Sequence, residues 1–180
     1  ISSGLVGSEM CIRDSIRRGR PAVHIAYDMP TAINAGDAML ALAFEMIAES
    51  ADIKDEVMRD LVRVIGRMVR KVSEGQQMDM DFENRSDGVS EQEYLTMISG
   101  KTAAMFETCA QTGAMLAGAS HDIQETCRLW GLETGLCFQL MDDLIDITGD
   151  TETLGKPAGS DVLELSLIHI PSPRDLMRSR

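Results

Sequence analysis

FQLMDDLID, at residues 138–146, closes a predicted helix that spans residues 122–148. Asp142 and Asp146 are four residues apart and therefore share one helical face, while the residues around them are mostly apolar. Carboxylates on an apolar helix repel one another and resist desolvation unless a cation compensates them. Magnesium prefers a few carboxylates together with substrate phosphate oxygens. Taken alone, the pattern favours a solvated acidic helix end, and a magnesium site at Asp142, Asp143 and Asp146 is the alternative that the neighbouring motifs bring forward.

Outward from this stretch, the sequence predicts helices and no strand. Residues 34–50 are apolar nearly all round, as a buried central helix would be. Residues 55–72 carry apolar side chains at three-to-four spacing. A capping-box pattern at Ser90 and Glu93 opens a helix that runs to about residue 117. The predicted fold class is therefore all-α, a helical bundle.

The composition excludes some classes of partner. The 180 residues include 29 Asp and Glu against 17 Lys and Arg, a formal net charge of −12, which disfavours nucleic-acid binding. Anionic substrates would need local cations or metal ions to overcome this field. Cys109, Cys127 and Cys137 are widely spaced in apolar surroundings, which indicates buried free thiols in a reducing compartment, and a cytoplasmic location is expected. No apolar run reaches membrane-spanning length, so no transmembrane segment is expected.

The two ends of the chain share a DNA-level relation. The DNA ATGTGTATAAGAGACAG encodes Met10 to Ser15, and its reverse complement, CTGTCTCTTATACACAT, encodes Leu165 to Ile170. Unrelated protein segments have no reason to be reverse complements, and the element resembles the transposon end of a sequencing-library adapter. We therefore expect residues 1–15 and 165–180 to be non-native, and residues 16–164 to be the central part of one helical domain. The alternative is a native N-terminus and a native basic tail.

Three further stretches carry candidate functional residues. Lys101-Thr102 places a charge in the middle of a predicted helix among apolar residues, although a lysine stem can also snorkel to the surface. Arg17-Arg18 belongs to a dense cationic segment that could equally be an ordinary basic loop. Lys156 follows the aspartates, in Leu154-Gly155-Lys156-Pro157.

In their order, these pieces resemble the trans-isoprenyl diphosphate synthases, also called polyprenyl synthetases. Each piece alone is weak, but the ordered set is specific and spans all of residues 16–164. Residues 75–83 (GQQMDMDFE) look most like the archaeal-type short-chain members, the geranylgeranyl and farnesyl diphosphate synthases. The matching elements are Arg17-Arg18-Gly19 with Pro21 and His24, Asn34-Ala35-Gly36-Asp37, Gly75-Gln76 with Asp79, Lys101-Thr102, Phe138-Gln139 with Asp142-Asp143 and Asp146, Gly149-Asp150, and Leu154-Gly155-Lys156.

The resemblance implies a reaction and a metal. In that family, two aspartate-rich motifs face each other across a helical cavity and hold magnesium ions on an allylic diphosphate. The allylic group is then condensed head to tail with isopentenyl diphosphate. By this resemblance, Asp142 would be the main magnesium ligand, with Asp143 and Asp146 in support. Magnesium is the expected cofactor, and a homodimer is the expected assembly.

The resemblance also implies how the substrates are held. The allylic diphosphate would be bound by three cations, and isopentenyl diphosphate by Arg18. Two polar side chains would line the reacting centre. The implied binding residues are thus Lys101, Lys156 and Arg17 for the allylic diphosphate, with Thr102 and Gln139 at the reacting centre; Lys101, Thr102, Gln139 and Lys156 would be the catalytic set.

One part of the family pattern is missing. The first aspartate-rich motif lies just before the Arg-Arg-Gly element, where this chain has adapter-like residues such as Ser8 and Glu9. We therefore expect the parent protein to be an enzyme and this polypeptide alone to be inactive.

Two alternatives to a transferase share part of the pattern. A class I terpene cyclase would use the same metal-assisted ionisation, and a partner subunit of a prenyl synthase would be non-catalytic. Arg17-Arg18 and Lys101-Thr102 favour the transferase, because a second diphosphate substrate needs cations of its own. The intact aspartates of residues 142–146 favour a catalytic subunit.

Overall fold

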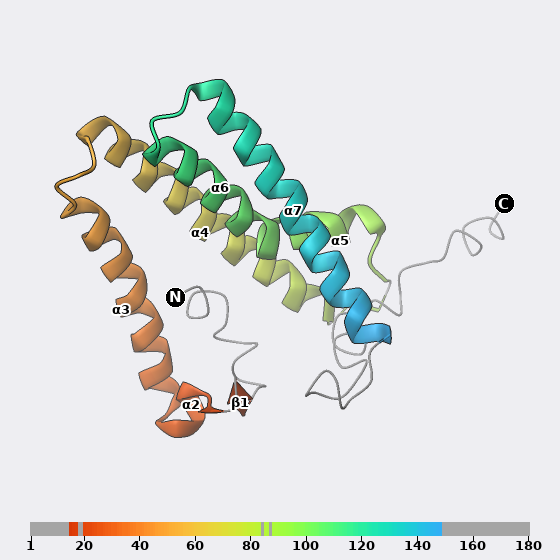
Figure 1. The fold of residues 1–180 in the computed structure, drawn as a ribbon. Coiled ribbons are helices and arrows are strands. Elements are labelled where there is room, and N and C mark those ends of the chain that lie inside the picture. Colours follow the sequence, from red (N-terminus) through yellow and green to blue (C-terminus); the bar gives the residue numbers. More distant parts are fainter. Residues whose placement is uncertain (1–14, 18–19, 84, 87, 149–180) are drawn as a thin grey trace, which may run out of the picture. The chain divides into compact units, whose positions relative to one another are not determined.

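The computed structural model describes residues 15–17, 20–83, 85–86 and 88–148. The chain divides between Val62 and Arg63 into two compact units. Nearly all of the described residues are helical, which confirms the all-α class (Figure 1).

The first unit begins with a small hairpin that the sequence did not predict. Strand β1 (Ile16–Arg17) pairs antiparallel with β2 (Arg20–Pro21), and Ile16 lies opposite Pro21. The expectation of no strand was therefore wrong for these four residues. Helix α2 (Val23–Ala26) follows at once.

Helix α3 (Met29–Ala48) starts five residues before the predicted bound at residue 34. The reason is local, because the Asp28 side chain accepts a hydrogen bond of 2.7 Å from the Thr31 backbone N–H and Pro30 lies in the first turn. The hydrogen bonds from Thr31 also lower the pKa of Asp28. At 20 residues, α3 is long and apolar enough to cross a membrane by length and composition alone, which corrects the expectation that no run reaches that length.

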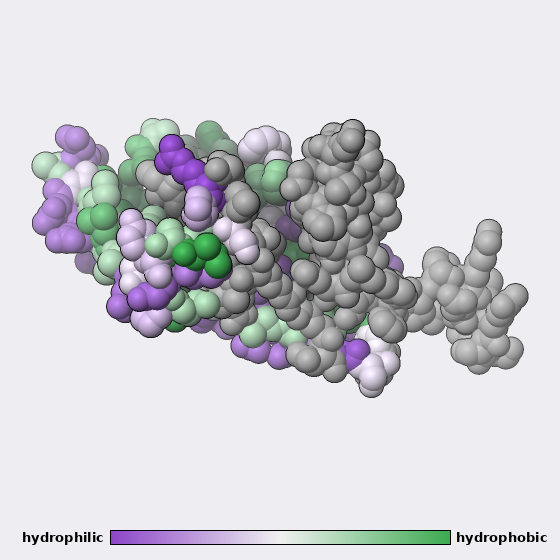
Figure 2. Space-filling model, turned by 90° about the horizontal axis from the view of Figure 1, so that it is seen from below, coloured by the Kyte–Doolittle hydropathy of each residue, from purple (hydrophilic) through white to green (hydrophobic). Residues whose placement is uncertain are grey.

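The expected burial of α3 is also not found in the described part of the chain. None of its residues is buried there. Large apolar side chains are likewise exposed on the last helix, α7 (His121–Thr148), and Met46 and Trp130 are 65% and 67% exposed. Figure 2 shows hydrophobic residues, in green, at the surface beside hydrophilic ones, in purple. Cover for these apolar faces would have to come from outside the described residues.

Helix α4 (Asp55–Glu83) continues well past the predicted bound at residue 72. Its buried face persists at helical spacing through Val72, Gly75, Asp79 and Phe82. Hydrophobic periodicity missed residues 73–83 because two of the four buried positions named here are a glycine and an aspartate.

The predicted helix of residues 90–117 is interrupted by a π-helical turn. Helix α5 (Glu91–Ile98) leads into the π-helix η1 (Ser99–Ala103), and α6 (Ala104–Leu116) follows. The capping box at Ser90 and Glu93 is present as predicted. Single π turns within α-helices are rare and concentrate at functional sites.

Helices α6 and α7 lie side by side in the second unit (Figure 1). They are joined by residues 117–120, where Gly118 has a φ of 71° that favours glycine. Both helices also contact η1, and α5 contacts α7.

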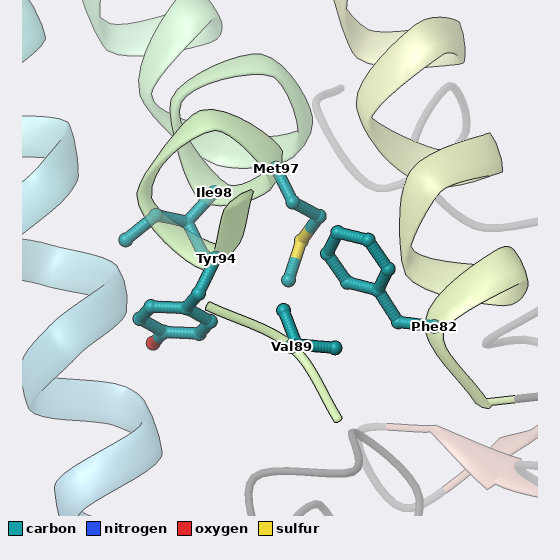
Figure 3. Packing of buried hydrophobic residues seen from close by; sticks show 5 residues of the cluster. All are labelled: Phe82, Val89, Tyr94, Met97 and Ile98. Atoms are coloured by element: carbon teal, nitrogen blue, oxygen red, sulfur yellow. The ribbon is translucent and has the colours of Figure 1, made fainter. Parts of the chain in front are cut away.

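The buried core of the second unit is a cluster formed by α5, the segment just before it and the end of α4 (Figure 3). Phe82, Val89, Tyr94, Met97 and Ile98 form it. The predicted cysteine environment is only half right. The three cysteines are free, but Cys109 and Cys137 are exposed.

Candidate active site

The backbone of α4 meets the π turn at two glycines. A Cβ on Gly75 would lie 2.2 Å from the Lys101 backbone nitrogen, and one on Gly100 would lie 2.9 Å from the Lys71 carbonyl oxygen. Real Cβ atoms do not approach backbone atoms so closely, so any larger residue would push the two helices apart. The glycines therefore allow α4 and η1 to touch.

Helix α7 approaches the same turn in a similar way. A Cβ on Gly135 would lie 2.6 Å from the Ala103 Cα atom, and one on Gly131 would lie 2.5 Å from the Phe106 carbonyl oxygen. Ala103 is fully buried. The π turn is thus fixed by close backbone contacts with α4 and with α7.

Lys101 is buried and paired with a carboxylate of α4. Its Nζ atom lies 2.5 Å from Asp79 Oδ2, and the side chains are 11% and 6% exposed. Lys101 therefore does not extend its ammonium group to the surface, the alternative that the sequence left open. The Gln76 amide also donates to Asp79 Oδ2, at 3.5 Å, while buried Oδ1 has no hydrogen-bond partner among the described residues. A buried carboxylate oxygen without a donor is unusual and fits a place where a further donor binds.

Thr102, the next residue, begins a chain of hydrogen bonds across three elements. Its hydroxyl donates to Gln139 Oε1 on α7 at 2.5 Å, and the Gln139 amide donates to Asp143 Oδ1 at 2.9 Å. The Tyr94 hydroxyl on α5 donates to Asp143 Oδ2. Burial, and then the Asp143 carboxylate, raise the pKa of Tyr94.

The aspartates of α7 differ in exposure. Asp142 is exposed, whereas Asp143 is 5% exposed. Asp146 lies on the same helix, four residues after Asp142, and its side chain is outside the described residues. Among the described residues, no group of three or more His, Cys, Asp or Glu side chains is placed to hold a metal ion.

A third buried carboxylate lies beyond the π turn, at Glu107 on α6. Its Oε2 atom pairs with Lys71 Nζ at 2.8 Å and its Oε1 atom pairs with Arg128 of α7. Arg128 also pairs with Glu125 at 2.7 Å, which raises the pKa of Arg128 and lowers that of Glu125. Each oxygen of Glu107 therefore has a cationic partner.

The structure brings together four of the predicted site residues. Lys101, Thr102, Gln139 and Asp143 belong to two adjoining sets of contacts around the π turn. Arg17 is described only as backbone of β1 in the first unit, and Arg18 and Lys156 lie outside the described residues.

Two residues of the site were given no role by the sequence. Asp79 was matched to the family pattern but not assigned a partner, and Tyr94 was not singled out. A tyrosine on an apolar helix face carries no sign of a carboxylate 49 residues away. The i+8 spacing of Lys71 and Asp79 on α4 was the available signal, since it places both charges on the face of Gly75.

Comparison with known proteins places this arrangement in a family. A sequence model described as polyprenyl synthetase matches residues 13–168. Over 161 residues the chain is 40% identical to a geranylgeranyl diphosphate synthase of Sulfolobus acidocaldarius, covering 89% of this chain and 48% of that protein. A geranylgeranyl diphosphate synthase of Methanosarcina mazei is 40% identical over 162 residues, covering 89% of this chain and 49% of that protein. The chain thus spans about half the length of these relatives.

Solved structures agree with these relatives. A geranylgeranyl pyrophosphate synthetase from Pyrococcus horikoshii is 36% identical with a TM-score of 0.80, covering 88% of this chain and 48% of that one. A geranyltransferase from Helicobacter pylori, solved with magnesium and isoprenyl diphosphate, is 25% identical with a TM-score of 0.79 and covers 98% of this chain and 59% of that one. The expected resemblance to archaeal short-chain synthases is confirmed, and the chain belongs to the polyprenyl synthetase family.

Proposed function

We propose that the complete protein containing this segment is a prenyltransferase that condenses an allylic diphosphate with isopentenyl diphosphate, head to tail. The observation that carries the proposal is the buried Lys101 cation beside Thr102 and Gln139, on a π turn that two helices hold in place. A fixed cation in a buried site stabilises the charge that develops on a departing diphosphate. The relatives named above are prenyl synthases, which favours this reading over a terpene cyclase.

The proposed reaction gives these residues two roles, binding of the diphosphate and lining of the reacting centre. Lys101 would bind the allylic diphosphate and follow its negative charge as the carbon–oxygen bond breaks. Thr102 and Gln139 would line the reacting centre beside the allylic carbons, where apolar helix walls keep water from the cation. Lys156 and Arg17 would add charge to the allylic diphosphate, and Arg18 would bind isopentenyl diphosphate.

Near the end of α7, the exposed carboxylate of Asp142 is available to magnesium. Magnesium sites in enzymes of phosphorylated substrates commonly use one or two carboxylates and complete the shell with water and phosphate oxygens. Exposed Asp142 offers one such carboxylate, and Asp146 follows it by one helical turn. When bound, magnesium would neutralise charge on the leaving diphosphate. Asp142 would then be the principal protein ligand, with Asp143 and Asp146 in support.

Incorporation of radiolabelled isopentenyl diphosphate by the complete protein, with each substrate varied in turn, tests this function. Asp142→Ala should lower kcat by at least about 100-fold with little change in substrate KM, because the metal acts mainly as diphosphate departs. Arg18→Ala should raise KM for isopentenyl diphosphate more than KM for the allylic substrate. Near-wild-type turnover of Asp142→Ala would refute the role given to the aspartates.

We further propose that the complete protein is a cytoplasmic homodimer. Helix α3 supports this, because its apolar side chains have no cover among the described residues and a second copy could provide it. Asp37 and Glu45 disfavour a membrane span, since charges within a span are costly. Light scattering of the complete protein in buffer without detergent tests the homodimer, and fractionation of the cells tests the cytoplasmic location. A monomer, or a protein that stays in the membrane fraction, would contradict them.

The proposal that residues 1–15 and 165–180 are non-native rests on the reverse-complement relation of their coding DNA. Residues 16–164 would then be the central part of the synthase domain, and this polypeptide alone would be inactive. Sequencing the source gene across both junctions tests it. Codons for Leu165 to Arg180 in uncontaminated DNA would refute it.

A further inference from the structure

We propose that Tyr94 is a positioning residue for the transfer reaction, because its hydroxyl anchors Asp143 and thereby fixes how Gln139 and Thr102 face the reacting centre. This inference rests on the proposed function. It also gives Asp143 a task that Asp142 does not share, the support of polar side chains.

The direction of the hydrogen-bond chain follows from which groups can donate. An ionised carboxylate only accepts, so the Gln139 amide must turn its NH₂ group toward Asp143. The Gln139 carbonyl oxygen then faces Thr102, whose hydroxyl must donate to it. The Thr102 proton is committed in this way, and only the lone pairs of its oxygen remain for a substrate. One acceptor, Asp143, therefore sets the polarity of the whole chain.

Helix geometry separates the two adjacent aspartates. Successive residues of an α-helix point about 100° apart, so Asp142 and Asp143 cannot share a face. Asp143 instead lies one turn after Gln139 on the buried side of α7, while Asp142 is exposed. Tyr94 and Gln139 each donate to one oxygen of Asp143. Each oxygen of the Asp143 carboxylate therefore accepts a hydrogen bond from a protein side chain.

Tyr94 is well suited to be an anchor because its ring is held by the core. It is 8% exposed and belongs to the cluster with Phe82, Met97 and Ile98. Figure 3 shows its hydroxyl oxygen directed away from Met97 and Phe82, toward the blue ribbon of α7. The packing fixes the ring, and the ring fixes the hydroxyl donor against Asp143 with little freedom to move.

Tyr94→Phe in the complete protein removes the hydroxyl and keeps the ring. We expect kcat to fall about 10-fold, equivalent to one hydrogen bond, with KM for both substrates within about 2-fold of wild type. Tyr27→Phe is the matched control, since Tyr27 is 76% exposed and takes no part in the hydrogen-bond chain of Thr102, Gln139 and Asp143, and its kcat should be unchanged. Equal kcat values for the two variants would overturn the inference, because a packing role alone survives the loss of the hydroxyl.

A double-mutant cycle tests whether Tyr94 acts through the chain. Thr102→Val removes the other end, and the combined variant with Tyr94→Phe should be no slower than Thr102→Val alone within about 2-fold. Effects that multiply would mean that the two hydroxyls act independently, and the positioning role would fail.

A third measurement separates this inference from the proposed function. Thermal unfolding of Tyr94→Phe, Asp143→Asn and the combined variant needs no substrate, and the shifts in Tm should be clearly non-additive if the hydroxyl and carboxylate are paired. Additive shifts would refute the hydrogen-bond chain even in an active enzyme. An inactive wild type with non-additive shifts would instead refute the proposed function and leave the chain standing.

Discussion

Two buried carboxylates of the second unit, Asp79 and Glu107, differ in how their oxygens are used. Glu107 has one cation on each oxygen, Lys71 on one and Arg128 on the other. Asp79 pairs with Lys101 through Oδ2 alone, and its buried Oδ1 has no partner among the described residues. Asp79 belongs to α4, and Glu107 of α6 contacts the same helix through Lys71, eight residues before Asp79.

Under the proposed function, this difference distinguishes a structural cluster at Glu107 from a substrate-binding one at Asp79 and Lys101. A buried charge is stable when it is paired and its remaining lone pairs are satisfied, which is the condition of Glu107. Asp79 keeps an unused acceptor beside a buried cation, so the pair can take a further donor or release Lys101 to an anion. We infer that Glu107 holds α4, α6 and α7 together, whereas Asp79 holds Lys101 ready for the diphosphate.

The largest expected effect comes from removing the cation of the Asp79 pair. Lys101→Met should lower kcat at least about 100-fold and also reduce stability by about 3 kcal/mol, because Asp79 is left buried without a counter-charge. Adding Asp79→Asn should restore most of the stability but none of the activity. Enzyme assays and denaturant unfolding of the complete protein measure both. Recovery of activity in the double variant would show that Lys101 serves only to neutralise Asp79.

Glu107→Gln is the counterpart in the other cluster. Loss of the Glu107 charge should reduce the free energy of unfolding by about 2–3 kcal/mol. The loss is smaller than that for a fully buried ion pair because Lys71 is 46% exposed and can turn to water. The kcat of the folded protein should stay near that of wild type. Unfolding by urea and a steady-state assay below the transition provide the test. A loss of kcat comparable with that of Lys101→Met would erase the distinction between the clusters.

The all-α fold and several candidate site residues could be predicted from local sequence patterns. Features that depend on contacts between residues far apart in the sequence could not. Asp142 and Lys101 could be singled out as candidates because charged groups on apolar helices stand out within a few residues, whereas Gln139 was singled out through the family resemblance. The strands at residues 16–17 and 20–21 are too short to show a period-two pattern. The π turn at residues 99–103 depends on contacts with α4 and α7 that no local pattern encodes. Tyr94 depends on a partner in another helix, so its role appears only when α5 and α7 are placed together.

Gly75 lies between the two clusters on α4, and its replacement tests whether they are independent. A Cβ at this position would meet the Lys101 backbone, so Gly75→Ala should cost about 2 kcal/mol and reduce kcat by displacing the π turn. Gly66→Ala is the control in the same helix, because nothing lies within 4 Å of its Cβ position. That variant should gain about 0.5–1 kcal/mol through helix propensity. Equal Tm values for the two variants would contradict the close helix contact.

Glu93, whose side chain is 40% exposed, completes the comparison because it shows what pairing does for a carboxylate near the surface. Glu93 accepts hydrogen bonds from the Ser90 backbone N–H and hydroxyl, at 2.8 and 2.6 Å, and from Arg85 at 2.7 Å. The Ser90 contact first, and then Arg85, lower the pKa of Glu93 from its usual 4.5 to about 2. Since the ionised form is the one stabilised in the folded protein, its contribution is present above pH 4.5 and is lost as the pH falls toward 2.

The smallest expected effects lie at this cap. Ser90→Ala should cost about 1 kcal/mol at neutral pH, the usual loss for an N-cap hydroxyl. Glu93→Gln should be less stable than wild type at neutral pH, and the gap between their urea midpoints should narrow as the pH falls from 4.5 toward about 2, because the carboxylate of the unfolded chain takes up its proton before that of the folded protein. The same acidification should leave the gap between wild type and Gly75→Ala nearly constant, since no ionisation accompanies that contact. A gap for Glu93→Gln that stays constant with pH would mean that its carboxylate adds no charge-dependent stability, and that the cap rests on the serine hydroxyl alone.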